Sequence, residues 1–441
     1  MPEDVSTTER AAIRTDIKLS EESFLSDEFV RQLVGVGEID IMVGLPTHNS
    51  AKTIGPAVTA IQDGIVHWFP RERAAIINAD GGSRDGTPDL VVNAAIDDVR
   101  QKEFNRRALR TLPCISARYG NTPERGTTLR TILAAGDLLG ARAATVISPD
   151  SDDVKPEWLP VLLSPVYKEG VDLVLPTYSR HKFDGLLITN LLYPMSRALF
   201  GLRIREPFAL DFAFSSNLGS QFLAQNSWND ESVRAASEIR FTIAAATGGF
   251  RICQSFLGTK PHVERRASDL VPALRQTIGP LFSAMESTFA LWGSKTGSEA
   301  IPTLGQEPQF TVDPVRVNRK HLAEMFRAGV SDLQSVFQAI LSAGTLAELQ
   351  RISQSEETDF EYPAELWVKT VYEFAVAYRK AVISRDHIIQ ALAPLFRGRA
   401  LTCLIENRSC SATDVENQVE NLCLEFERLK PYLLDLWNGK A

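Results

Sequence analysis

The sequence predicts an α/β fold in which helices flank a mostly parallel, Rossmann-like sheet, followed by a C-terminal helical extension. Three observations support this prediction. Short apolar runs alternate with segments of helical spacing through residues 38–180. Polar turns follow three of these runs. After about residue 270 the spacing of apolar residues is helical almost throughout.

The expected strands are short runs rich in Ile, Val and Ala, and the expected helices repeat apolar residues every three or four positions, as Ile54, Val58, Ile61 and Ile65 do. In chain order we expect a helix at 27–34, a strand at 39–45, a helix at 52–68, a strand at 74–79, a helix at 88–95, a strand near Cys114, a helix at 127–139, and strands at 143–147 and 171–176. Later amphipathic helices are expected at 333–341, 367–383 and 419–433.

The bulk composition excludes some classes of protein. A formal net charge of −8 over 441 residues provides no general basic field for nucleic acid or anionic lipid. No apolar stretch approaches the ~20 residues that span a membrane. The five cysteines are scattered without a C-x-x-C pair, which indicates neither a disulfide framework nor a zinc site. We therefore expect a cytoplasmic protein with no nucleic-acid partner and no membrane span.

The motif Asp150-Ser151-Asp152 follows the expected strand at 143–147. Two carboxylates on one tight turn suit Mg²⁺ or Mn²⁺, which usually takes one or two carboxylates and leaves positions for substrate phosphates. The motif therefore indicates a metal–diphosphate site. A solvated acidic turn is the alternative, because Asp and Ser are ordinary turn residues.

Two further polar turns follow earlier strands, namely Pro46-Thr47-His48-Asn49 and the stretch Asp80-Gly81-Gly82-Ser83-Arg84-Asp85-Gly86-Thr87. The glycines allow positive φ angles and a close approach of the backbone, and Asp80 can accept hydrogen bonds from a base or a ribose. Because ligands bind beyond the carboxyl ends of parallel strands, we expect all three turns to line one crevice. A plain β-to-α turn is the alternative for the glycine-rich stretch.

The order P-x-x-N, D-G-G-S-x-D-G-T, D-x-D resembles the nucleotide-binding half of GT-A glycosyltransferases, over roughly residues 38–180. The Q-x-x-R-W motif typical of inverting relatives is absent from the sequence. The chain looks more like the retaining glucosyl-3-phosphoglycerate synthases and their glucosylglycerate synthase relatives. Arg125-Gly126-Thr127-Thr128 stands where that group has a K-G-x-A-like turn, and the resemblance continues more weakly to about residue 275.

This resemblance implies roles for particular residues. It implies a nucleotide-sugar site formed by Pro46, Thr47, Asn49, Asp80, Ser83, Arg125, Asp150 and Ser151. It implies Mg²⁺ or Mn²⁺ held by Asp150, Asp152 and His262. It places Glu238 and Asp211 as the catalytic or acceptor-site acids. For His262, Glu238, Arg125 and Asp211 the alternatives are an ordinary loop histidine, a helix carboxylate, a surface cation and a charge at a strand end.

The acceptor is the point where this chain departs from the resemblance. Leu187 falls where the phosphoglycerate-using enzymes have an Arg, and Glu264 where they have an Asn. A leucine cannot pair with phosphate as an Arg does, and a carboxylate repels phosphate. The expected acceptor is therefore D-glycerate. Its expected contacts are Arg180, Lys182, Gly185 and Thr189, with a solvated turn as the alternative for the basic cluster.

The sequence thus favours a retaining, metal-dependent transfer of glucose from a nucleotide-diphosphate sugar to this small hydroxy acid. Transfer to 3-phosphoglycerate, a mannosyl donor and an inactive nucleotide-sugar-binding scaffold remain alternatives. For the helical extension, the sequence leaves two alternative roles, which are dimerisation and covering the active site. The expected regions are a tail and short helix at 1–36, a nucleotide-sugar-binding half at 37–180, an acceptor-binding half at 181–275 and a mostly helical region at 276–441.

Overall fold

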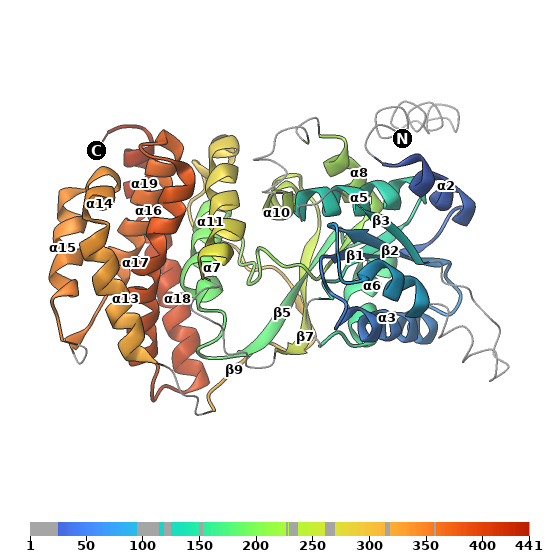
Figure 1. Cartoon of the computed structure of the whole chain (residues 1–441), viewed down its shortest axis with the longest axis horizontal. Helices are drawn as coiled ribbons and strands as arrows, with labels where there is room; N and C mark the ends of the chain where they lie inside the picture. The colour runs from blue at the N-terminus through green and yellow to red at the C-terminus, as the bar shows by residue number, and fades with distance from the viewer. Residues whose placement is uncertain are drawn as a thin grey trace. The chain divides into compact units, whose positions relative to one another are not determined.

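The computed structural model describes residues 25–94, 114–118, 125–149, 153–225, 228, 237–260, 270–313, 318–356 and 359–440. The chain divides into two compact units, shown with their elements in Figure 1. Unit 1 comprises Met1–Val174 and Leu210–Trp228, and unit 2 comprises Leu175–Ala209 and Asn229–Ala441. Strand β5 (Leu173–His181) begins in unit 1 and continues into unit 2.

Unit 1 is a sheet with helices on both faces. Its other elements are α2 (Asp27–Val36), β1 (Ile41–Thr47), α3 (Ile54–Trp68), β2 (Ala74–Asp80), β3 (Cys114–Arg118), α5 (Arg125–Leu138), β4 (Ala143–Val146), α6 (Trp158–Glu169), β6 (Phe212–Ser215) and α8 (Ser216–Leu223). Helices α3 and α6 pack together on one face of the sheet, and α5 and α8 on the other (Figure 1). The strands β1 and β2 are buried between these layers, as their apolar sequences predicted.

The strand order in unit 1 is β3-β2-β1-β4-β6, and β1 to β4 are parallel. The mostly parallel sheet predicted from the alternation of elements is therefore confirmed. Strand β6 is not among the strands expected from the sequence, although a strand end at Asp211 was an alternative, and it runs antiparallel to β4 and to the start of β5. Its four residues are too few to show a period. Strand β1 also runs through Pro46, because a proline one residue from the end of a strand removes little of its hydrogen bonding.

Unit 2 joins three further strands to a set of helices. Its elements besides β5 are the π-helix η1 (Ile188–Leu192), α7 (Tyr193–Phe200), α10 (Ser237–Thr247), β7 (Ile252–Thr259), α11 (Leu270–Ser287), α12 (Phe289–Trp292), β8 (Thr303–Leu304), β9 (Phe310–Thr311), α13 (Arg319–Asp332), α14 (Gln334–Ile340), α15 (Ala343–Ser353), α16 (Ala364–Lys380), α17 (Arg385–Glu406), α18 (Ala412–Arg428) and α19 (Lys430–Trp437). Strand β8 pairs with β7, and β9 pairs with β5.

One apolar core runs through unit 2 and includes residues of η1, α7, α11 and the helices from α13 to α19. Within this core, the indole N–H of Trp367 in α16 donates a hydrogen bond to the carbonyl oxygen of Asn190 in η1, 2.8 Å away. The C-terminal helices thus share a core with the segment that carries Lys182 to Thr189. The predicted helix at 419–433 is two helices, because Pro431 cannot continue α18 and suits the first turn of α19.

Helix α17 is the one helix among the described residues that is long and apolar enough to cross a membrane. Its most apolar window is 83% buried within unit 2. It contributes Leu392, Leu395 and Leu401 to the core described above. Burial of this kind is typical of the central helix of a helical core.

Candidate functional site

Strands β1 and β2 end side by side at one edge of the sheet in unit 1, where Thr47 pairs with Asp80. The hydroxyl oxygen of Thr47 lies 2.8 Å from Oδ1 of Asn78 and 3.0 Å from Oδ1 of Asp80. The backbone N–H of Gly81 donates to the carbonyl oxygen of Thr47 at 2.8 Å. The polar turns after β1 and β2 therefore meet at the carboxyl ends of parallel strands, where α/β sheets bind ligands.

The carboxylate of Asp80 is fully buried and is surrounded by donors of its own turn. Besides Thr47, the backbone N–H groups of Gly82 and Ser83 and the Ser83 hydroxyl donate to it. These bonds fold the glycine-rich turn over the strand end. In this structure Asp80 thus organises the turn, and its predicted contact with a base or ribose stays a prediction.

Asn49 connects the two turns and has the unusual positive φ of 53°. Its backbone N–H donates to the Ser83 hydroxyl at 2.8 Å, and its side-chain Oδ1 accepts from the N–H of Arg84 at 3.0 Å. Asparagine adopts this left-handed conformation more readily than most residues, which explains the residue type at this position. Asn49 therefore holds the glycine-rich turn in place from the neighbouring turn.

A second set of bonds joins the same turns nearer to α3. The N–H of Ser50 donates to the Thr87 hydroxyl at 3.0 Å, and the N–H of Ala51 donates to Oδ2 of Asp85 at 2.9 Å. The Thr87 hydroxyl in turn donates to Oδ1 of Asp85 at 2.6 Å. This hydroxyl has the largest effect on Asp85 and lowers its pKa below the usual value; burial opposes the shift and the N–H of Ala51 adds to it.

Asp211 lies beside the end of β4. Its neighbour Phe212 pairs with Val146, the last residue of β4, and Oδ1 of Asp211 accepts a hydrogen bond from the N–H of Ser148. The N–H of Ile147 donates to the carbonyl oxygen of Gly44 in β1 at 3.0 Å. The chain leaving β4 is therefore fixed on both sides, two residues before Asp150.

Four of the predicted residues, Asp150, Ser151, Asp152 and His262, lie outside the part of the chain that the structure describes. Arg125 begins α5, but its side chain lies outside that part as well. Within the described ranges, no group of three or more His, Cys, Asp or Glu side chains is arranged to hold a metal ion. The metal site stays a prediction.

The two predicted acids belong to different units. Asp211 is in unit 1, and Glu238 is in the first turn of α10 in unit 2, where it is half-buried. Their shared catalytic role also stays a prediction.

The predicted acceptor residues all lie in unit 2, and two of them already have protein partners. The Arg180 guanidinium donates to Oε1 of Glu206, with its Nη2 at 2.6 Å. Burial alone would lower the pKa of Arg180, but Glu206 raises it above the usual value. The Lys182 ammonium donates to the carbonyl oxygens of Arg408 and Cys410, in the turn after α17.

Gly185 has a φ of 64°, and an added Cβ would lie 3.2 Å from the side chain of Arg180. Thr189 in η1 donates to the carbonyl oxygen of Gly185 and accepts from the Asn190 amide at 3.2 Å. Leu187 packs against the apolar core of unit 2. The residue is thus used for packing here.

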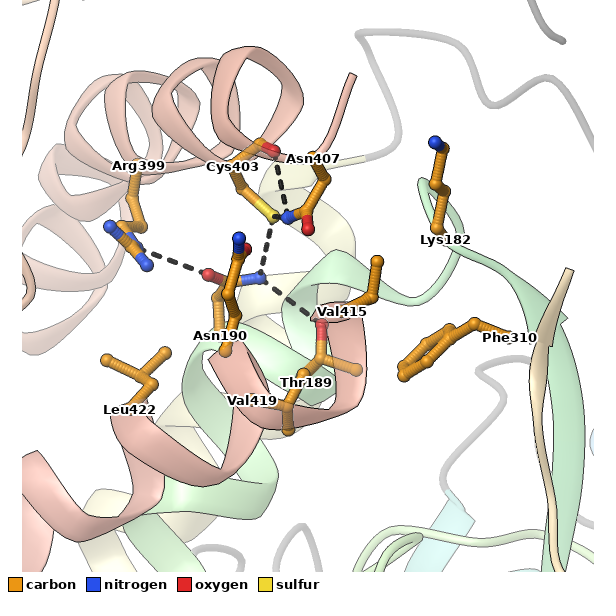
Figure 2. Close-up of a pocket in the computed structure, with 11 residues that line it drawn as sticks. Lys182, Thr189, Asn190, Phe310, Arg399, Cys403, Asn407, Val415, Val419 and Leu422 are labelled. Carbon is orange, nitrogen blue, oxygen red and sulfur yellow. Dashed lines mark hydrogen bonds between the residues drawn. The ribbon is translucent and has the colours of Figure 1, made fainter. Parts of the chain in front are cut away.

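Lys182 and Thr189 also line a cavity in unit 2, shown in Figure 2. Most of its other lining residues come from the C-terminal helices, in particular Arg399 and Cys403 of α17, Asn407 after it, and Gln418 of α18. Sequence reasoning did not find Arg399, Asn407 or Gln418, which lie more than 200 residues along the chain from Lys182. No local pattern around them signals a polar cavity.

The described chain is thus a mixed α/β protein with a mostly parallel sheet flanked by helices and a C-terminal helical region. No protein-family model matches the chain, and no curated protein matches it.

Among solved structures, it is similar to glucosyl-3-phosphoglycerate synthase from Mycobacterium tuberculosis. A complex of that protein with Mg²⁺ and uridine diphosphate is 20% identical over 64% of this chain and 86% of that chain, with a TM-score of 0.41. A complex with Mn²⁺, UDP-glucose and phosphoglyceric acid is 20% identical over 66% and 91%, with a TM-score of 0.39. These structures come from the group that the sequence motifs resemble.

Proposed function

We propose that the chain is a retaining, divalent-metal-dependent glycosyltransferase that moves glucose from a nucleotide-diphosphate glucose to D-glycerate. The observation that supports this most is the pair of interlocked turns after β1 and β2, beside the strand β4 that leads to Asp150-Ser151-Asp152. The order of the three segments in the sequence, and the meeting of the turns after β1 and β2 at one sheet edge beside β4, suit a nucleotide sugar with its diphosphate over the Asp-x-Asp.

The residues proposed for the metal have the chemistry that it requires. Two carboxylates, from Asp150 and Asp152, and the imidazole of His262 are an oxygen-rich set of donors that suits Mn²⁺ or Mg²⁺. When bound, the metal offsets the negative charge that develops on the diphosphate leaving group. The bond from Ser148 to Asp211 holds the chain that enters this set.

The proposed reaction proceeds on one face of the sugar. The acceptor hydroxyl oxygen forms a bond to the anomeric carbon while the bond from that carbon to the β-phosphate oxygen breaks on the same side. The hydroxyl proton passes to the departing phosphate oxygen, and nucleoside diphosphate leaves. The protein contributes orientation and electrostatics, with Glu238 orienting the acceptor.

The choice of an unphosphorylated acceptor rests on Leu187. A leucine has no cation that could pair with a phosphate, and this side chain packs against the core of unit 2. Arg180 is paired with Glu206 and is thereby partly neutralised. These two observations favour D-glycerate over 3-phosphoglycerate.

A product screen tests the proposal. Full-length protein with Mn²⁺ or Mg²⁺ is offered UDP-, GDP- and ADP-glucose, and the matching mannose donors, with D-glycerate or 3-phosphoglycerate, and products are identified by mass spectrometry and NMR. We expect an α-linked glucosylglycerate. Turnover only with 3-phosphoglycerate would overturn the acceptor, a β-linked product would overturn retention, and nucleotide binding without any turnover would favour a scaffold.

A further inference from the structure

The side chain of Asn190 in η1 joins the predicted acceptor residue Thr189 to a C-terminal helix. Nε of Arg399, in α17, donates to Oδ1 of Asn190 at 3.2 Å, and Nδ2 of Asn190 donates to the Thr189 hydroxyl oxygen at 3.2 Å (Figure 2). All three residues lie in unit 2, although 209 positions of sequence separate Asn190 from Arg399. A chain of hydrogen bonds therefore runs from α17 to the segment where the acceptor is expected to bind.

Arg399 fixes the orientation of the Asn190 amide. A guanidinium only donates hydrogen bonds, so the amide atom that faces Arg399 is the oxygen, and the amide nitrogen faces Thr189. Arg399 is itself held in place, because its Nη1 donates to the carbonyl oxygen of Tyr362 at 3.0 Å and its charge interacts with Glu406 of the same helix. Asn190 and Arg399 are 3% and 6% exposed, so both groups are shielded from water.

The orientation of this amide decides which hydrogen bond the Thr189 hydroxyl can offer. Its oxygen accepts from Asn190, so its hydrogen must point elsewhere. In this structure it donates to the carbonyl oxygen of Gly185 over 3.4 Å, which is longer than the usual O–H···O distance of about 2.7–2.8 Å. Thr189 is only half-buried, so a bound molecule can replace this weak bond. Thr189 and Asn190 also belong to the π-helix η1, and π-helical turns are frequent at functional sites.

We propose that Asn190 is a positioning residue, which makes the Thr189 hydroxyl a hydrogen-bond donor to the carboxylate of the acceptor. A carboxylate only accepts hydrogen bonds, so a site for a hydroxy acid needs donors whose direction is fixed. The inference rests on the proposed function, because it takes D-glycerate as the molecule bound at Thr189. It gives α17 a part in the acceptor site, although this helix lies beyond the residues that the sequence resemblance covers.

Asn190→Asp in the full-length protein tests the inference with almost no change of shape. One carboxylate oxygen still accepts from Arg399, but the other accepts as well, so the Thr189 hydroxyl turns its hydrogen toward position 190 and away from the acceptor. We expect the KM for D-glycerate to rise at least about tenfold, since a charged hydrogen bond is lost, with kcat and the KM for the sugar donor unchanged. A merely structural bridge to Arg399 would survive this change, because a carboxylate binds a guanidinium at least as well as an amide does. An unchanged KM for D-glycerate, or an equal rise in the KM for the donor, would therefore overturn the inference.

Thr189→Val separates the direction of the hydrogen from the added charge. Alone it should raise the KM for D-glycerate by a similar factor, and an unchanged KM would overturn the inference. In the Thr189→Val background, Asn190→Asp should raise the KM no further, because Arg399 balances the new charge. A further rise of the same factor would show simple repulsion and would also overturn the inference.

Asn318→Asp is the matched control for the substitution. Asn318 is exposed in unit 2 and caps α13 by accepting a hydrogen bond from the N–H of His321 at 3.1 Å. An aspartate caps a helix equally well, so this variant should leave every kinetic constant unchanged. A rise in the KM for D-glycerate as large as that in Asn190→Asp would overturn the inference.

Isothermal titration calorimetry with D-glycerate, without a sugar donor, separates this inference from the proposed function. Binding that Asn190→Asp and Thr189→Val each weaken, in a protein that transfers no sugar, would support the inference and overturn the function. Sugar transfer with an unchanged KM for D-glycerate in both variants would support the function and overturn the inference. A wild-type protein that neither binds D-glycerate nor transfers sugar to it would overturn both.

Discussion

The backbone N–H of Ser148 donates a hydrogen bond to Oδ1 of Asp211 over 3.0 Å. Both residues are buried, with 7% and 6% of their surface exposed. Ser148 stands two residues before Asp150, so the bond fixes the chain at the entry to the predicted metal motif. Such a bond requires an oxygen acceptor at this position and does not require a negative charge.

Substitution of Asp211 therefore separates a positioning role from an acid–base role. Asp211→Ala leaves the buried N–H of Ser148 without a partner, and we expect the free energy of unfolding to fall by about 1–3 kcal/mol. We also expect a higher Mn²⁺ concentration for half-maximal sugar transfer. Asp211→Asn keeps an acceptor oxygen, so it should retain most of the stability and of the apparent Mn²⁺ affinity.

Urea unfolding and Mn²⁺ titrations of the transfer rate measure both effects. The Asn and Ala variants are compared at saturating Mn²⁺. If both lose the same fraction of kcat while neither loses stability, the charge of Asp211 is required. That result would favour the catalytic role that the sequence predicted for this residue.

The bonds between Asp85, Thr87 and Ala51 predict a pH dependence of stability. A carboxyl group whose pKa is lower in the folded than in the unfolded state stabilises the fold above the unfolded pKa of about 4. This stabilisation is lost as the pH falls through the lower, folded pKa. Asp85 has such a lowered pKa, so the stability difference between the wild type and Asp85→Asn should be constant near neutral pH and shrink below about pH 4.

Urea unfolding of the two proteins between about pH 7 and pH 3 measures this difference. Thr87→Val is the control, because the Thr87 hydroxyl has the largest effect on the pKa of Asp85. In the Thr87→Val background, Asp85→Asn should change stability almost equally at all pH values. A difference that grows toward acid pH in the wild-type background would contradict the prediction.

The sequence predicted the first strands and turns because their signals are local. The apolar run of β1 is buried against both helical layers, and the turn that begins at Asp80 follows β2 as expected. The features that the sequence could not predict depend on pairing between distant segments of the chain. Strand β6 acquires its place only by pairing with β4, whose residues lie 66 to 72 positions earlier in the chain.

The same limit applies to the predicted acceptor residues. The basic tripeptide that contains Lys182 predicts a contact with the acceptor, but in the structure its ammonium donates to the turn after α17, 226 and 228 residues away. The same tripeptide predicts an acceptor contact for Arg180, whose partner in the structure is Glu206, 26 residues further on. A local sequence does not show which protein groups will bind a charged side chain after folding.

Arg197 of α7 provides a test of the ion pairs that attach α18. Its side chain is fully buried and donates to Glu420 at 2.6 Å and to Glu427 at 2.8 Å. Arg197→Met leaves the Glu427 carboxylate, which is 15% exposed, without its partner. We expect the free energy of unfolding to fall by about 3–5 kcal/mol.

The matched control is Arg428→Met at the end of α18. Arg428 pairs with Glu425 at 2.6 Å and with Glu365 at 3.2 Å, but its side chain is 57% exposed. Exposed pairs contribute under about 1 kcal/mol, so this variant should unfold almost as the wild type does. Similar urea midpoints for the two variants would show that burial does not decide the contribution of these pairs.

The crossing of α13 and α17 depends on a glycine. A Cβ added to Gly329 would lie 2.2 Å from Cβ and 2.6 Å from Cγ of Pro394, whose ring cannot turn aside. Gly329→Ala must therefore move the two helices apart, and we expect the free energy of unfolding to fall by about 1–3 kcal/mol.

Gly344→Ala in α15 is the control, because nothing lies within 4 Å of its added Cβ. That change should leave stability unchanged or raise it by up to about 1 kcal/mol, since alanine favours helix. Thermal unfolding of both variants measures the difference in stability. A Gly329→Ala protein as stable as Gly344→Ala would show that α13 and α17 are not in close contact at this crossing.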